Sequence, residues 1–377
     1  MEYGDKLDDI IEAAVTRGDA PGVVAAVSRG DEGYVAAAGV MAVGGPPMQP
    51  DTLFRITSIT KPVTAAVVLS LVEDGLIGLD EPVDWLLPEL ANRRVLTRPD
   101  GPLTDTIRAE RAVTTRDLLT FTWGFGMQGA MFMAPEPWPI VTAVRERELG
   151  AFGPPQPDTT PEPDTFMARL GELPLLAQPG ERWLYSAGSQ VLGVLAARAA
   201  GVPFDEVMQE RVLDPLGMDD TAFHAADTSR LATAYERHDG QLTVSDPPDG
   251  QWSRPPAFPD GAGGLVSTAE DLLRFGLMLR RGGGPVLKPG TVAEMTSDQL
   301  TPAQRANVWP GFSFLDDRGW GYGVSVTDWG YTWEGGSGTA WSNIPGRDAT
   351  VVVLTQRAPD ETGMPAVCEQ VRTAMSS

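Results

Sequence analysis

The chain has 377 residues, a formal net charge of −22 at pH 7 and a sequence pI of about 4.4. Hydrophobic residues make up 42% and charged residues 21%, which is ordinary for a soluble globular protein. The acidic excess argues against binding to nucleic acids or to anionic membrane surfaces, because both attract faces rich in Lys and Arg.

The cysteine and histidine counts exclude further classes of protein. Cys368 is the one cysteine, so the chain cannot form an internal disulfide. His224 and His238 are the two histidines, which are too few for a zinc site of the usual His/Cys type. With one cysteine and two histidines, a catalytic site built on a cysteine nucleophile and a histidine base is also a poor hypothesis. We expect no metal and no cofactor.

The first residues, "MEYGDKLDDIIEAAVTRG", are acidic and amphipathic, without the basic and apolar regions of a signal peptide. No run of 18 or more apolar residues appears, so no membrane span is expected. The sequence therefore predicts a cytoplasmic protein. It leaves the oligomeric state open, a homo-oligomer included.

The N-terminal part predicts a helix, two strands and a second helix. Residues 5–17 have apolar side chains at helical spacing, and residues 21–30 and 33–43 predict strands joined by a turn. Residues 58–75 predict a helix that is apolar nearly all round except in its first turn. Such a helix is buried in a core rather than lying on the surface.

The middle of the chain, from about 80 to 260, alternates short helices with Pro-rich loops. Thr114 and Asp117 predict a capped helix start, and residues 186–201 predict a helix that ends at Gly201. Ser267 and Glu270 predict a further capping box.

The last hundred residues predict short strands, followed by a C-terminal helix over about 361–375. Strands at both ends of the chain with helices between them indicate an α+β fold. We expect a discontinuous α/β lobe, residues 1–80 and 260–377, in which an antiparallel sheet is flanked by the N- and C-terminal helices. Residues 81–259 would form a mostly helical lobe with a candidate lid at 127–165, and the cleft between the lobes would hold the ligand.

Ser58 and Lys61 lie three residues apart at the polar end of the predicted core helix, in "RITSITKP". On a helix they share a face, so the amine can reach the hydroxyl and accept its proton once burial lowers the lysine pKa. The alternative is helix capping by Ser or by Thr57, since both residue types are common at helix starts.

Two further stretches favour catalysis. Tyr185 lies at the start of a predicted helix in "QPGERWLYSAGSQVLG", where its hydroxyl could relay a proton if a lysine ammonium keeps it acidic. The glycine-rich stretch "YTWEGGSGTAW" could present backbone N–H groups to an oxyanion. The alternatives are an ordinary tyrosine at a helix entry and a bulged strand.

In this order the three stretches resemble the serine β-lactamase and penicillin-binding-protein superfamily, with its S-x-x-K, S-D-N and K-T-G motifs. The resemblance is to the class C-like branch, where Tyr-x-Asn replaces S-D-N, and it covers nearly the whole chain. The supporting stretches are "TLFRITSITKPVTA", "RDLLTFTWGF", "QPGERWLYSAGSQVLG", "VLDPLGMDDTAF", "GAGGLVSTAEDLLRF" and "GWGYGV".

The resemblance implies a role for each matching residue. Ser58 matches the acylated nucleophile, Lys61 its base partner and Tyr185 the proton-relay tyrosine. The sequence Trp333-Glu334-Gly335 stands where Lys-Thr-Gly is found in β-lactamases. The implied oxyanion hole is formed by the N–H groups of Ser58 and Gly336.

The departures from the family pattern indicate the substrate. Ala187 stands where Tyr-x-Asn has its Asn, and Trp333 stands where a Lys would hold a β-lactam carboxylate, so this stretch resembles the family VIII carboxylesterases. Phe121 and Trp123 replace the usual His and Ser, which predicts a more aromatic cleft. Trp138 is placed near the substrate as well. Because neighbouring strand residues alternate faces, Trp333 and Glu334 should not both point into the site.

These residues predict a serine carboxylesterase that forms an acyl-enzyme on Ser58 and acts on a small-molecule ester. One alternative is an acyltransferase that passes the acyl group to an amine or alcohol. Another is weak β-lactamase or D-amino peptidase-type amidase activity, and a third is a non-catalytic binding protein on the same fold.

Overall fold

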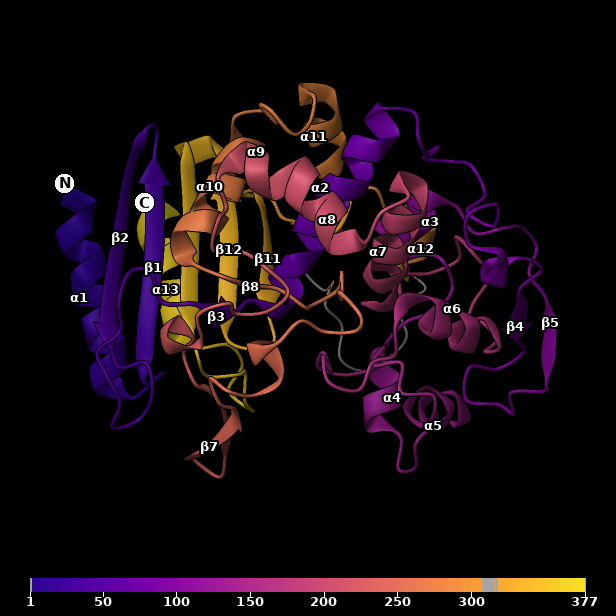
Figure 1. Cartoon of the computed structure of the whole chain (residues 1–377), viewed down its shortest axis with the longest axis horizontal. Coiled ribbons are helices and arrows are strands. Elements are labelled where there is room, and N and C mark those ends of the chain that lie inside the picture. Colours follow the sequence, from indigo (N-terminus) through magenta and orange to yellow (C-terminus); the bar gives the residue numbers. More distant parts are fainter. Residues whose placement is uncertain (1, 307–314, 316–317, 377) are drawn as a thin grey trace.

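The computed structural model describes residues 2–306, 315 and 318–376. Its centre is a seven-stranded antiparallel sheet with the strand order β2-β1-β13-β12-β11-β10-β9 (Figure 1). The strands are β1 (Gly22–Arg29), β2 (Glu32–Gly39), β9 (Gly319–Trp320), β10 (Ser325–Val326), β11 (Tyr331–Gly335), β12 (Thr339–Ile344) and β13 (Ala349–Thr355). The first and last strands of the chain pair directly, with Val27 opposite Val351.

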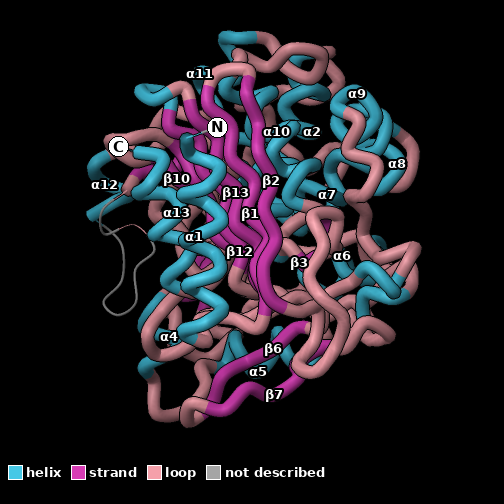
Figure 2. Tube along the Cα trace, turned by 90° about the vertical axis from the view of Figure 1, so that its left-hand side faces the viewer, coloured by secondary structure: helices cyan, strands magenta, loops and turns pink. Residues whose placement is uncertain are grey.

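The middle of the sheet is covered on both faces. All seven residues of β13 are buried, as are the first seven of β1, which explains their nearly continuous apolar sequences. The terminal helices α1 (Glu2–Arg17) and α13 (Ala366–Ser376) cover one face, as Figure 2 shows. Helix α10 (Ala269–Arg280) packs on the other face. The predicted antiparallel sheet flanked by the two terminal helices is confirmed.

Beyond the sheet lies a mostly helical part, on the right in Figure 1. Its helices include α3 (Thr115–Leu119), α4 (Gly129–Met133), α5 (Pro139–Glu146), α6 (Pro163–Gly171), α7 (Ala187–Ala200) and α8 (Phe204–Met208). The short helix α9 (Asp214–Leu216) follows α8 and lies next to α10, on the sheet side in Figure 1. Two short helices, α11 (Pro289–Met295) and α12 (Pro302–Ala306), precede β9. Two-stranded pairs are formed by β3 (Phe54–Arg55) with β8 (Val266–Ser267), β4 (Arg94–Leu96) with β5 (Thr106–Arg108), and β6 (Ala234–His238) with β7 (Gln241–Asp246). The predicted lobe boundaries stay a prediction.

Helix α2 (Thr60–Glu73) lies between the sheet and the helical part and packs against α7. Every residue from Thr60 to Leu71 is buried, Lys61 included. The structure therefore agrees with the sequence that this is a core helix. In the described part of the chain, no helix is both long and apolar enough to cross a membrane.

Helix starts agree with the sequence at one place and differ at another. Thr114 and Asp117 form a reciprocal capping box at α3. The box predicted for Ser267 and Glu270 is wrong by one residue, because Thr268 caps α10 by accepting from the N–H of Asp271 at 3.2 Å. Ser267 is still part of strand β8, where it pairs with Phe54, so the helix can begin only after it.

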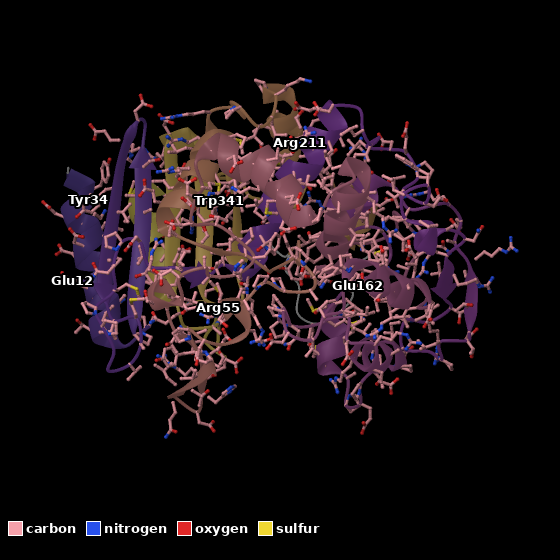
Figure 3. The ribbon with its side chains drawn as sticks, viewed as in Figure 1. Glu12, Tyr34, Arg55, Glu162, Arg211 and Trp341 are labelled. Atoms are coloured by element: carbon pink, nitrogen blue, oxygen red, sulfur yellow. The ribbon has the colours of Figure 1, made fainter. Side chains whose placement is uncertain are left out.

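A buried ion pair holds the strand that leads into the candidate site. Arg55, labelled in Figure 3, donates from Nε to Asp246 at 2.6 Å and from Nη1 to the carbonyl of Ala232, also at 2.6 Å. The Arg55 and Asp246 side chains are only 4% and 8% exposed. Removing one partner would leave the other charge buried without compensation.

We therefore expect Asp246→Ala to lower the free energy of unfolding by about 3–5 kcal/mol, measured by urea denaturation. The control is Asp31→Ala, which breaks an ion pair with Arg281 whose side chains are 96% and 54% exposed. That change should cost less than about 1 kcal/mol, since exposed pairs contribute little. Equal losses for the two variants would contradict the importance of the buried pair.

Candidate active site

Ser58 lies in a single 3₁₀ turn, Thr57–Ile59, between β3 and α2. Thr57 has a φ of 41°, in the left-handed region that non-glycine residues seldom adopt. Its hydroxyl accepts from the N–H of Ser337 at 3.3 Å and caps no helix, so the capping interpretation of Thr57 is wrong. The Thr57 hydroxyl instead connects the turn that contains Ser58 to Ser337, which follows β11.

Lys61 follows in the first turn of α2, with its amine facing Ser58. The Lys61 Nζ donates to Ser58 Oγ at 2.9 Å and to the carbonyl oxygen of Ala262 at 2.6 Å. Burial lowers the pKa of Lys61 to about 7, although the charge of Asp260 acts in the opposite direction. The neutral amine, which can accept a proton, is therefore available near neutral pH.

Tyr185 reaches the same serine from the helical part. It lies two residues before α7, in a β-bridge with Met127, and Ser186 with a φ of 87° turns the chain into the helix. The Tyr185 hydroxyl donates to Ser58 Oγ at 2.9 Å, and Trp333 Nε1 donates to the Tyr185 hydroxyl at 3.2 Å. The structure thus brings Ser58, Lys61 and Tyr185 together, as the sequence predicted.

Lys61 and Tyr185 differ in how readily they titrate. Burial raises the pKa of Tyr185, and hydrogen bonds with Ser58 and Trp333 offset this only in part, while the charge of Glu334 adds to it. The Lys61 Nζ lies 4.7 Å from the centre of the Tyr185 ring, yet the pKa of Tyr185 is raised. The expectation that the lysine keeps this tyrosine acidic is wrong. Tyr185 keeps its proton at neutral pH and Lys61 is the group that titrates.

The end of β11 lies directly against the turn that holds Ser58. A Cβ on Gly335 would be 2.3 Å from the carbonyl oxygen of Ile56, so this close approach requires glycine. Ser337 contacts Thr57 from the other side of Gly336. Gly336 itself is exposed and follows the last residue of the strand, next to the Ser58 turn.

The two side chains that replace Lys-Thr lie in different surroundings. Trp333 is 2% exposed and packs on Tyr185, with the ring centres 5.5 Å apart. The Glu334 carboxylate is half-buried and accepts from Arg318 Nη1 at 3.2 Å.

An aromatic cluster surrounds Tyr185. Its buried members are Phe121, Trp183, Tyr185, Leu300, Leu315, Trp320 and Trp333. The Phe121 ring centre lies 5.9 Å from that of Tyr185, and Trp320 lies 4.7 Å from Trp333. Phe121 has a φ of 58°, so it joins Thr57 and Ser186 as a non-glycine residue with positive φ at the site. The surroundings of Tyr185 are therefore aromatic, and the predicted aromatic cleft stays a prediction.

Sequence reasoning missed Trp183 and Trp320 and misplaced two other tryptophans. Trp123 is fully buried in the main core, 5.4 Å from Phe125 between ring centres, and the half-buried Trp138 packs on the same core. The sequence placed both near the substrate, but they pack in the main core and not in the aromatic cluster around Tyr185. Trp183 could have been found from its spacing, because it precedes Tyr185 by two residues in extended chain.

Ala187 and the candidate lid lie beside the site. Ala187 is the first residue of α7 and is 1% exposed, so no polar group can replace its methyl without repacking. Within the segment 127–165, Met127 pairs with Tyr185, and Pro155 packs so closely on Gly263 that a Cβ there would lie 2.5 Å away. Both contacts adjoin the residues that surround Lys61, but the lid function stays a prediction.

Two curated relatives match most of the chain. Protein Rv1367c of Mycobacterium tuberculosis is 38% identical over 343 residues, covering 84% of this chain and 80% of that protein. Esterase EstB of Burkholderia gladioli is 31% identical over 382 residues, covering 94% of this chain and 90% of EstB.

Among solved structures, EstCE1, described as a hydrolase with promiscuous acyltransferase activity, superposes with a TM-score of 0.79 at 24% identity. The superposition covers 99% of this chain and 98% of EstCE1, which shows the shared fold. The sequence profile of the Beta-lactamase family matches residues 7–369. With the serine, lysine and tyrosine of that family converging in one site, the chain belongs to the Beta-lactamase family.

Proposed function

We propose that this protein is a serine hydrolase that cleaves carboxylic esters through an acyl-enzyme on Ser58. The observation that supports it best is the position of Ser58 Oγ, 2.9 Å from both the Lys61 amine and the Tyr185 hydroxyl. A hydroxyl becomes a good nucleophile when a base of this kind is in hydrogen-bond reach. The similarity to EstB over nearly the whole chain supports an ester as the substrate.

In the proposed reaction, neutral Lys61 accepts the Ser58 proton as Oγ attacks the acyl carbonyl. The backbone N–H groups of Ser58 and Gly336 donate to the developing oxyanion. Tyr185, which keeps its proton at neutral pH, donates to the departing alkoxide. Water then attacks the acyl-enzyme, and the same groups act in the reverse order to release the acid.

Two residues favour esters over β-lactams and amides. The methyl of Ala187 cannot form the hydrogen bonds of the family's asparagine amide, and the indole of Trp333 carries no charge to hold a carboxylate. An amine also leaves less readily than an alkoxide, so a site with fewer polar contacts should favour the ester. Phe121, Trp333 and the backbone of Gly335 would line the acyl or alcohol side of the substrate.

An acyltransferase is the second candidate, because the acyl-enzyme can react with an alcohol or amine in place of water. EstCE1 illustrates that this fold accommodates both activities in one protein. The aromatic cluster favours this candidate, since an apolar acceptor could exclude water from the acyl-enzyme. A cytoplasmic location and a homo-oligomer stay predictions.

Ser58→Ala should abolish ester hydrolysis while leaving the fold intact, since no other group supplies the nucleophile. A fluorophosphonate should label the native protein at Ser58, located by peptide mass spectrometry, and should not label the variant. Circular dichroism serves as the control for folding. Hydrolysis that persists in a folded Ser58→Ala variant would refute the proposed function.

The pH dependence of kcat/KM should have an acid limb near pH 7, because protonated Lys61 cannot accept the Ser58 proton. Below that pH the rate should fall about tenfold per pH unit, as for a single required base. Tyr185→Phe should lower kcat and leave this limb in place, since Lys61 remains the titrating group. A limb near pH 4–5 would instead point to a carboxylic acid, whose ordinary pKa is about 4.

Substrate class can be tested with p-nitrophenyl esters of increasing acyl length, measured alongside nitrocefin. We expect kcat/KM on the best ester to exceed that on nitrocefin by at least about 100-fold, the discrimination that a few lost polar contacts can supply. Turnover of nitrocefin equal to that of the esters would overturn the ester preference. Adding an alcohol or amine and analysing the products separates hydrolysis from acyl transfer.

A further inference from the structure

A buried carboxyl group lies behind the carbonyl that contacts Lys61. Asp260 is 7% exposed, and its Oδ1 accepts from the N–H of Ala262 at 2.7 Å. Its Oδ2 accepts from Gln190 Nε2, on α7, at 3.1 Å. The carbonyl of that same Ala262 accepts from the Lys61 amine at 2.6 Å. One residue therefore connects Asp260 to the proposed base.

The turn over residues 260–264 is fixed at further points. The carbonyl of Gly261 accepts from Thr64 Oγ1 at 2.8 Å, one helical turn after Lys61 on α2. The N–H of Gly264 donates to the Asp260 carbonyl at 2.8 Å. A Cβ on Gly261 would lie 2.5 Å from the carbonyl of Ser189, so this turn also packs closely on α7. The turn is thus a rigid support between α2 and α7.

We propose that Asp260 is a positioning residue for Lys61. Its carboxylate holds the turn so that the Ala262 carbonyl faces the Lys61 amine, and its negative charge favours the ammonium form of Lys61. The inference rests on the proposed serine mechanism, in which Lys61 is the base. It assigns Asp260 the task of setting the pH at which that base becomes available.

Two hydrogen bonds stabilise the ionised form of the Asp260 carboxyl. Each of its oxygens accepts a hydrogen bond from an N–H donor, which suits the carboxylate form. Within the described part of the chain, the buried Oε1 of Gln190 has no hydrogen-bond partner. If the Gln190 amide were reversed, its Oε1 would face the Asp260 carboxylate and repel it. The Nε2 group therefore points to Asp260, and Oε1 is left without a hydrogen bond. Burial raises the pKa of Asp260 above its usual range, and these donors together with Lys61 offset that rise only in part.

Three elements contribute groups around the Lys61 amine. The 3₁₀ turn contributes the Ser58 hydroxyl, and the segment before α7 contributes the protonated Tyr185. The turn before β8 contributes Asp260, the negative charge among these three groups. Glu334 of β11 acts on Tyr185 and is paired with Arg318. Asp260 is therefore the charge whose removal should change the protonation of Lys61.

The test is Asp260→Asn, which keeps an oxygen for the Ala262 N–H and can donate to Gln190 Oε1 after the Gln190 amide reverses. Shape is retained and the charge is lost, so Lys61 loses its proton more easily. The acid limb of kcat/KM should move to lower pH by about one unit, the lower end of the effect of a nearby opposite charge. The rate of Ser58 labelling by fluorophosphonate should show the same shift.

Asp260→Ala removes the hydrogen bonds as well as the charge. We expect kcat to fall by roughly 10- to 100-fold, as misplaced catalytic groups do, with KM little changed. Asn at this position should restore most of that loss. A purely structural aspartate would lower the free energy of unfolding in both variants without moving the acid limb.

Asp271→Asn is the matched control, because Asp271 is also a buried carboxyl that accepts from a backbone N–H, that of Asp220 at 3.0 Å, and from Thr221 Oγ1 at 2.9 Å. In the Asp271→Asn variant, the acid limb of kcat/KM should stay at the same pH as in the native protein. If Asp260→Asn does not fold, Gln190→Leu replaces it, since losing that donor weakens ionisation of Asp260 and should shift the limb the same way by less.

An unchanged acid limb in a folded Asp260→Asn or Gln190→Leu variant that still labels at Ser58 would overturn the inference and leave the proposed function standing. Activity that survives Ser58→Ala would instead overturn the proposed function. The two failures are therefore distinguishable.

Discussion

The burial of one amine is the constraint on which the rest of the structure depends. Lys61 is almost completely enclosed, in a helix that is buried from Thr60 to Leu71, and its pKa is lowered to about 7. Such a group is costly to bury, so its donors need fixed acceptors. Ser58 and the Ala262 carbonyl supply them, and the strained Thr57 and the rigid 260–264 turn hold these two acceptors in position.

The sheet provides the rigidity that this arrangement requires. Because β1 pairs with β13, strands from the two ends of the chain form one sheet. Strand β11 lies in the same sheet, separated from β13 by β12 alone. The close approach of Gly335 to Ile56 then fixes the end of β11 against the Ser58 turn. The helical part approaches from the opposite side and contributes Tyr185 and Phe121. The site therefore lies where the sheet, helix α2 and the helical part meet.

The local sequence pattern predicted helices and strands well where the spacing of apolar residues or a glycine is enough to define the element. The apolar run of α2, the short C-terminal strands and the Gly201 helix end were readable because periodicity and glycine conformation are local properties. The capping box near Ser267 was misplaced by one residue because the extended pairing of β8 with β3 overrides the local signal. The packing of Trp123 in the main core and of Trp183 beside Tyr185 is set by tertiary contacts, which the local sequence does not reveal.

The sequence by itself determined the family, the candidate trio Ser58, Lys61 and Tyr185, and the absence of an asparagine at Ala187 and of a lysine at Trp333, because these follow from residue identity and order. Tertiary structure alone decided the protonation of the trio. Burial makes Lys61 the group that titrates near neutrality and keeps the proton on Tyr185, contrary to the expectation from residue types. Asp260 lies far from Lys61 in sequence, and only the folded chain brings its charge close enough to act on the amine. Protonation depends on what surrounds a group in space, which no local pattern records.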